Sequence, residues 1–214
     1  KGIYPLRLQV GIDALTVVSN KDADWAKSMS LDQLAEIWGP DNPPQKWSQV
    51  EPNWPNRDFE LYGAASTSGT FDYFTEVVMG QEDAHRRDYQ PTEHDNVIVQ
   101  GVQGSEYAMG YFGYAYYKQN KDRLRAVAID DGSGPVKPTL ETAQTNRYKP
   151  LSRPLFIYVN KKSLQRPDVR RFVEFFIRQS ATKLISQVGY VPITKETMEE
   201  NLRKIRVAVE NEED

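Results

Sequence analysis

The segment LYGAASTSGTF, residues 61–71, holds four Ser or Thr residues and two glycines between a strand pattern and a helix pattern. The start of a helix presents unpaired N–H groups and the positive end of the helix dipole, and short hydroxyl side chains add further donors. Together these groups favour binding of an oxyanion. A simple Ser or Thr N-cap accounts for the same spacing, so both interpretations stay open at this point.

The same segment does not match two better-known loops. No Gly-Lys-Ser or Gly-Lys-Thr follows it, as a Walker phosphate loop requires. Neither Ser66 nor Ser68 is preceded by the glycine of a nucleophile elbow. A hydrolase that uses Ser68 is therefore disfavoured, and no base is spaced to activate that serine. We expect no catalytic residue and no enzymatic activity.

Metal and cofactor chemistry have little support in this sequence. The chain has no cysteine and only two histidines, His85 and His94, which lie in the polar stretch HRRDYQPTEHD and are expected at the surface. The glycines of GVQG, residues 101–104, are too sparse for a dinucleotide fingerprint. We expect no metal site and no cofactor.

Composition limits the class of protein. With 214 residues and 39% hydrophobic composition, the chain can bury a core without disulfide or metal cross-links. Its net charge of -3 argues against a nucleic-acid partner, and the doublet Arg86-Arg87 is most simply solvated surface. No apolar run approaches the length of about 20 residues that crosses a bilayer.

Strand-like and helix-like runs alternate along the chain, which predicts an α/β fold with a mostly parallel sheet. Ser30 with Gln33 forms a capping box, Gly80 ends the helix after the hydroxyl segment, Thr92 with Asp95 caps a further helix, and Pro167 opens another. The expected strands cover residues 6–10, 14–18, 59–62 and 153–160, and the expected helices cover 31–38, 71–79, 93–102, 168–179 and a last segment from Thr194. The strand at 153–160 is continuously apolar and is expected at a central, buried position.

The aromatic run at Tyr111, Phe112, Tyr114, Tyr116 and Tyr117 could stack on a sugar or a base. A buried strand with an amphipathic flank explains the same pattern more simply. We therefore assign these side chains to the core.

Six segments taken in order resemble the motifs of the phosphate-binding proteins of bacterial ABC-type phosphate importers. They are SGTFDYFTE from Ser68, RRDY from Arg86, EHDNVIVQGV from Glu93, MGYFGYAYY from Met109, PLSRPLFIYVNK from Pro150 and VGYVPI from Val188. The resemblance runs from Val10 to about Thr194. Thr67 departs from it, because members of this subgroup usually carry Asp there.

The resemblance implies a periplasmic-binding-protein-like architecture of two lobes that close on phosphate. We expect a nearly complete lobe over residues 13–151, and an incomplete second lobe with the hinge from residues 1–12 and 152–214, because family members begin with a further N-terminal segment. The implied phosphate ligands are Ser68, Gly69, Thr70 and Arg86.

The implied function is an extracytoplasmic or periplasmic receptor that delivers inorganic phosphate to the membrane subunits of an ABC importer, with a membrane anchor in a segment outside this sequence. Self-association of this chain through uncovered apolar surface is a further expectation. Two alternatives stay open: a receptor for another oxyanion such as sulfate or molybdate, and a non-transport interaction module of the same fold.

Overall fold

A computed structural model describes residues 4–210 of the protein, which form two compact units. One unit is the continuous segment Ala14–Ser152, and the other combines the chain up to Asp13 with the chain from Arg153 onward. The boundaries expected from the sequence, 13 and 151, each lie one residue away from these. The assignment of the units to a complete and an incomplete lobe stays a prediction.

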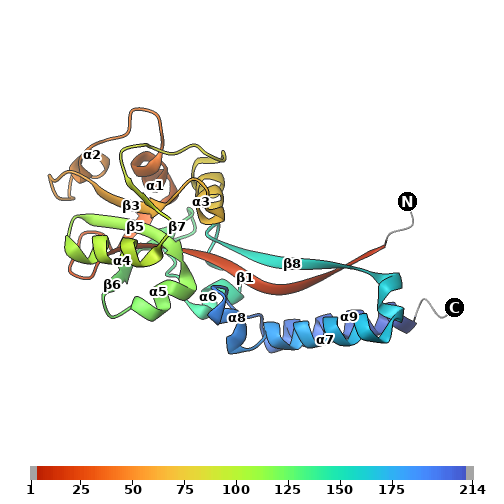
Figure 1. The fold of residues 1–214 in the computed structure, drawn as a ribbon. Coiled ribbons are helices and arrows are strands. Elements are labelled where there is room, and N and C mark those ends of the chain that lie inside the picture. Colours follow the sequence, from red (N-terminus) through yellow and green to blue (C-terminus); the bar gives the residue numbers. More distant parts are fainter. Residues whose placement is uncertain (1–3, 211–214) are drawn as a thin grey trace. The chain divides into compact units, whose positions relative to one another are not determined.

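Figure 1 shows the helices and strands, coloured along the chain from red at the N-terminus to blue at the C-terminus. Strand β1 (Pro5–Asn20) runs through both units. The other elements of the 14–152 unit are β2 (Ser28–Ser30), α1 (Leu31–Trp38), α2 (Trp47–Val50), β3 (Glu60–Ala64), α3 (Gly69–Met79), β4 (Gln90–Thr92), α4 (Asp95–Gly104), β5 (Ala108–Gly113), α5 (Tyr114–Asn120), β6 (Leu124–Ala126), β7 (Ala128–Asp130) and α6 (Leu140–Gln144). The remainder are β8 (Ser152–Asn160), the 3-10 helix η1 (Lys161–Gln165), α7 (Pro167–Ser180), α8 (Lys183–Gln187) and α9 (Lys195–Glu210).

The main sheet is mixed and not mostly parallel, which corrects the sequence-based expectation. Its strand order is β4-β3-β5-β1-β6, and β8 also pairs with β1. Strand β3 is parallel to β4 and β5, whereas β1 is antiparallel to β5 and β6. The two strands expected at 6–10 and 14–18 are one continuous strand. Strand and helix alternation predicted the class correctly, but it does not fix the direction in which the first strand enters the sheet.

Alternate side chains of the sheet face two different helical layers in the 14–152 unit. Leu15, Val17, Met109 and Tyr111 pack with α1 and α3, whereas Val18 and Phe112 pack with α4. This period of two is that of a strand covered on both faces. The assignment to the core is confirmed for Tyr111, Phe112 and Tyr114, which are buried. It is wrong for Tyr116 and Tyr117, which are half-buried at the side of the cluster around α4.

The other unit packs helices α7 and α9 against the first part of β1 and against β8. Leu8 and Val10 of β1 lie in one apolar cluster with Val173 and Ile177 of α7 and Ile205 of α9. The side-chain amide of Asn201 ties α9 to this strand by donating to the Gln9 carbonyl oxygen at 2.7 Å.

Strand β8 is not the central buried strand that its apolar sequence predicted. Most of its residues are only half-buried, Tyr158 is 65% exposed, and its pairing partner in the described residues is β1. An apolar run fits a strand buried on both faces, but the sequence alone cannot show which neighbours cover it.

Local signals placed most helix ends correctly. Ser30 accepts from the Gln33 N–H in a capping box, Gly80 has the left-handed φ of 73°, and α7 begins at Pro167. The start of α4 differs, because His94 is its N-cap and Thr92 instead accepts a hydrogen bond from the His94 N–H. Within residues 4–210, none of the helices is both long and apolar enough to cross a membrane.

Gly110 of β5 allows α4 to lie directly on the sheet. A Cβ atom at this position would be 2.5 Å from Ile98 Cγ2 and 2.7 Å from the Tyr62 carbonyl oxygen. We expect Gly110→Ala to lower the free energy of unfolding by about 1–3 kcal/mol, because neither neighbour can move without disturbing β3 or α4. Urea unfolding measures the change. Gly104→Ala is the control, since no atom lies within 4 Å of its added Cβ; equal losses for both variants would contradict the argument.

Candidate functional site

The hydroxyl segment forms the turn between β3 and α3. Ser68 is the N-cap of α3: its side chain accepts from the Thr70 N–H at 3.2 Å, and its carbonyl oxygen accepts from the N–H groups of Phe71 and Asp72. The Ser68 N–H donates to the Ala65 carbonyl oxygen at 2.9 Å. The sequence thus builds a closed turn from its own local hydrogen bonds, followed by a helix of 11 residues.

Donors remain at this turn after the local bonds are made. Within the described part of the chain, no acceptor takes the Gly69 N–H, and no heavy atom would lie within 4 Å of a Cβ added at Gly69. Gly69 is exposed, and Ser68 and Thr70 are half-buried. The structure therefore brings Ser68, Gly69 and Thr70 together at an open helix N-terminus.

A carboxylate that the sequence reading did not single out lies beside this turn. The hydroxyl of Thr67 donates to the carboxylate of Glu93, which follows β4. The two segments meet because β3 and β4 are parallel, and the Ala65 N–H donates to the Thr92 carbonyl oxygen at 3.0 Å. The sequence pattern of Thr92 and Asp95 predicts a helix cap and gives no sign of the strand that ends at Thr92.

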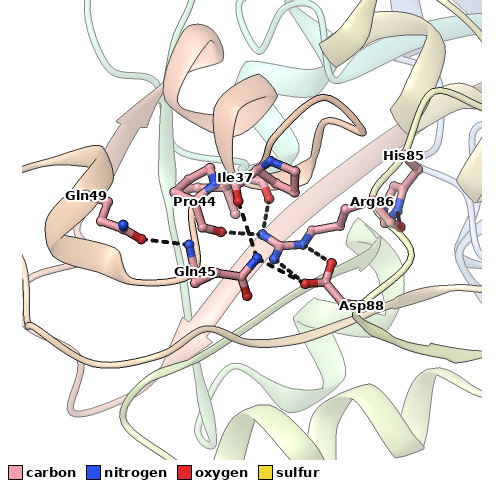
Figure 2. A network of polar contacts seen from close by, with 8 residues as sticks. Ile37, Pro44, Gln45, Gln49, His85, Arg86 and Asp88 are labelled. Atoms are coloured by element: carbon pink, nitrogen blue, oxygen red, sulfur yellow. Dashed lines mark hydrogen bonds and ion pairs between the residues drawn. The ribbon is translucent and has the colours of Figure 1, made fainter.

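The guanidinium of Arg86 is occupied by protein acceptors (Figure 2). Nε and Nη2 donate to the Asp88 carboxylate, each at 2.7 Å, and Nη1 donates to the carbonyl oxygens of Ile37 at 2.9 Å and Pro44 at 3.1 Å. Arg86 is 3% exposed, although its sequence neighbours predicted a solvated doublet. Its hydrogen bonds hold the pKa of Asp88 at about 2.

Arg86 and the Ser68–Thr70 turn are not brought together. The guanidinium lies 5.1 Å from the ring centre of Phe59, which directly precedes β3, whereas the turn follows β3. A five-residue strand spans about 16 Å. None of the hydrogen-bond partners of the Arg86 side chain belongs to the turn. The role of Arg86 as a phosphate ligand stays a prediction.

His85 is a core residue and not the surface residue that the sequence predicted. It is 6% exposed and packs among the rings of Trp38, Phe71 and Tyr89. Its Nδ1 lies 2.7 Å from the Arg86 carbonyl oxygen, so Nδ1 carries the proton and donates. Burial is the main cause that lowers the pKa of His85 from 6.5 to about 4.

Among the described residues, no group of three or more His, Cys, Asp or Glu side chains is placed to hold a metal ion. The second histidine, His94, is exposed. The chemistry of the site therefore lies in neutral hydrogen-bond donors and one neighbouring carboxylate.

A family model described as a PBP superfamily domain matches residues 3–180. The chain belongs to the PBP superfamily. Two sequence relatives are Protein SphX of Synechocystis, 44% identical over 203 residues, and the phosphate-binding protein PstS of Staphylococcus saprophyticus, 37% identical over 208 residues. These alignments cover 94% and 96% of this chain. The chain spans 60% and 63% of the lengths of the two relatives.

Solved structures support the same fold. A possible phosphate-binding protein from Planctomyces limnophilus is 42% identical, with a TM-score of 0.89 over 97% of this chain and 74% of that one. PstS from Borrelia burgdorferi shares the fold at 20% identity, with a TM-score of 0.71 over 89% of this chain and 73% of that one. The α/β two-lobe architecture and the resemblance to phosphate-binding proteins are confirmed.

The Arg86 network makes a testable contribution to stability. We expect Arg86→Ala to lower the free energy of unfolding by about 2–4 kcal/mol, because two carbonyl oxygens and Asp88 lose their donors. Arg87→Ala is the matched control: Arg87 is exposed, and its loss should change stability by less than about 0.5 kcal/mol. Urea unfolding near neutral pH measures both, and equal effects would show that the network contributes nothing.

The buried imidazole makes stability depend on pH. The unfolded chain binds a proton at His85 below pH 6.5, whereas the folded chain does so only near pH 4, so folding loses stability as pH falls through this window. We expect a loss of up to about 3 kcal/mol from this residue. The measurement is urea unfolding of wild type and His85→Gln at several pH values. If the unfolding free energies of wild type and variant changed equally with pH, the pH dependence would not come from His85.

Proposed function

We propose that this chain is the ligand-binding part of an extracytoplasmic receptor for inorganic phosphate, with Ser68, Gly69 and Thr70 as ligands. The observation that carries the proposal is the open turn at the start of α3, where the Gly69 N–H has no acceptor among the described residues. Membership of the PBP superfamily and the similarity to PstS and SphX support it. A helix start with free N–H groups stabilises an anion through hydrogen bonds and the helix dipole.

Arg86 is the fourth proposed ligand residue. It is proposed only from the sequence resemblance, because its side chain is already bonded to the protein. Four of its five N–H groups already donate to Asp88, Ile37 and Pro44. Arg86→Lys separates the two roles: a loss of phosphate affinity at unchanged stability supports direct binding, whereas a loss of stability at unchanged affinity supports a structural role.

The receptor role implies further partners. We propose that the receptor delivers phosphate to the membrane subunits of an ABC importer, acts outside the cytoplasm and catalyses no reaction, because its relatives carry the names of binding proteins. Attachment to a membrane through a segment outside this sequence is part of the same proposal. Self-association is also proposed, since Phe172 and Phe175 of α7 are 65% and 57% exposed.

Titration of inorganic phosphate into the isotope-labelled chain tests the site directly. We expect saturable chemical-shift changes at the N–H groups of Ser68, Gly69 and Thr70. Ser68→Ala and Thr70→Val should each weaken binding about fivefold, because one neutral hydrogen bond contributes about 1 kcal/mol. Sulfate, titrated in the same way, distinguishes a phosphate receptor from a general oxyanion receptor.

Ser30→Ala is the matched control for Ser68→Ala, because Ser30 is also the N-cap of a helix in the same unit. It should lower stability in the same way and leave phosphate affinity unchanged. Chemical-shift changes spread over the whole chain would show that phosphate does not bind at this turn. Equal phosphate affinities for wild type and both turn variants would show the same.

A further inference from the structure

A cavity lies among α5, β6 and the loop that leads into α6. It has a volume of about 310 Å³, and four of the side chains that line it are cationic: Lys21, Lys121, Arg125 and Lys137. None of the described residues that line it is acidic. The whole chain has a net charge of -3, so the positive charge of this cavity is opposite in sign to the charge of the chain.

The cations of this cavity are only partly neutralised. Arg125 Nη2 donates to the Asp24 carboxylate at 3.0 Å and to the Lys21 carbonyl oxygen at 2.6 Å, but its buried Nε has no acceptor in the part of the chain that the structure describes. Lys21 donates to the Asp122 carbonyl oxygen at 2.9 Å. Within residues 4–210, no carboxylate forms an ion pair with Lys121 or Lys137.

The cavity and the Ser68 turn lie at opposite edges of the sheet. Lys21 follows β1 directly, where Ser19 pairs with Met109 near the amino end of β5. The Ser68 turn follows the carboxyl end of β3, which is parallel to β5. Phosphate at the turn therefore cannot supply the counter-charge that the cavity lacks.

We propose that this cavity binds an oligophosphate. Like charges gathered in one concave site repel one another, and an anion with several charges relieves that repulsion. A volume of about 310 Å³ lies at the lower end of ligand sites and exceeds what one phosphate fills. Four cations also match a chain of linked phosphoryl groups better than a single phosphate. The ring of Tyr117 lines the same cavity and offers an apolar wall to an organic group attached to the phosphates.

Calorimetric titration of the 214-residue chain with tripolyphosphate and with ATP tests the proposal. We expect one site per chain, with at least tenfold tighter binding than for inorganic phosphate at the same site. The double variant Lys121→Gln with Lys137→Gln should weaken binding at least tenfold. Lys118→Gln is the matched control, because Lys118 lies on α5 three residues before Lys121, is exposed and does not line the cavity; it should bind like wild type.

The two probes distinguish an inorganic chain from a nucleotide as the source of the oligophosphate. Tighter binding of ATP that Tyr117→Leu reduces to the level of tripolyphosphate assigns the site to nucleotides, and equal binding of both probes assigns it to the phosphate chain alone. Thr70→Val should leave both affinities unchanged, so the result does not depend on the proposed receptor function.

Three results would overturn the proposal. The first is no saturable binding of either probe, and the second is an equal loss of affinity in Lys118→Gln and the double variant, which indicates unspecific attraction to surface charge. The third is a loss of oligophosphate binding in Thr70→Val, which places the ligand at the Ser68 turn.

Discussion

Strand β1 supplies the backbone hydrogen bonds on which both units depend. In the 14–152 unit its residues pair with β5 on one side and β6 on the other, so its N–H and C=O groups are satisfied inside the sheet. In the other unit Ile12 exchanges backbone hydrogen bonds with Val191, and the strand shares an apolar cluster with α7 and α9. Buried backbone groups need partners, so neither core can form unless this one segment is extended.

Because of the strand directions, the polar groups of the 14–152 unit lie in two places, at opposite ends of the strands of the sheet. Because β3, β4 and β5 are parallel, their carboxyl ends lie at one edge, where the Ser68 turn meets Glu93. Arg86 lies beside Phe59, where β3 begins, and the cationic side chains around Lys21 and Lys121 also lie away from the turn. Ligands of open α/β sheets bind beyond the carboxyl ends of the strands, which fits the neutral donors at Ser68 to Thr70.

The segment from His85 to Asp88 shows how buried polar groups fix a loop. Arg86 joins α1 and the proline-rich loop after it through the carbonyl oxygens of Ile37 and Pro44, and His85 closes the aromatic cluster around Trp38. Four of the five N–H groups of the Arg86 side chain and the Nδ1–H of His85 have acceptors, which is the condition under which burial of such groups is tolerated. Among the described residues, the buried Nε1 of Trp38 has none. The loop is held by long-range contacts that have no signature in its own sequence.

The sequence by itself determined the α/β class, the helix ends set by Ser30, Ser68, Gly80 and Pro167, and the turn at Ser68–Thr70. These features depend on hydrogen bonds and backbone preferences within a few residues, which is why they can be read locally. Only the tertiary structure decided the antiparallel entry of β1, the half-exposed position of β8, and the burial of His85 and Arg86. The Arg86 side chain binds a carbonyl oxygen 49 residues away, and no local pattern specifies a partner at that distance. The physical reason is that burial depends on which segments pack together, and that is a property of the whole chain.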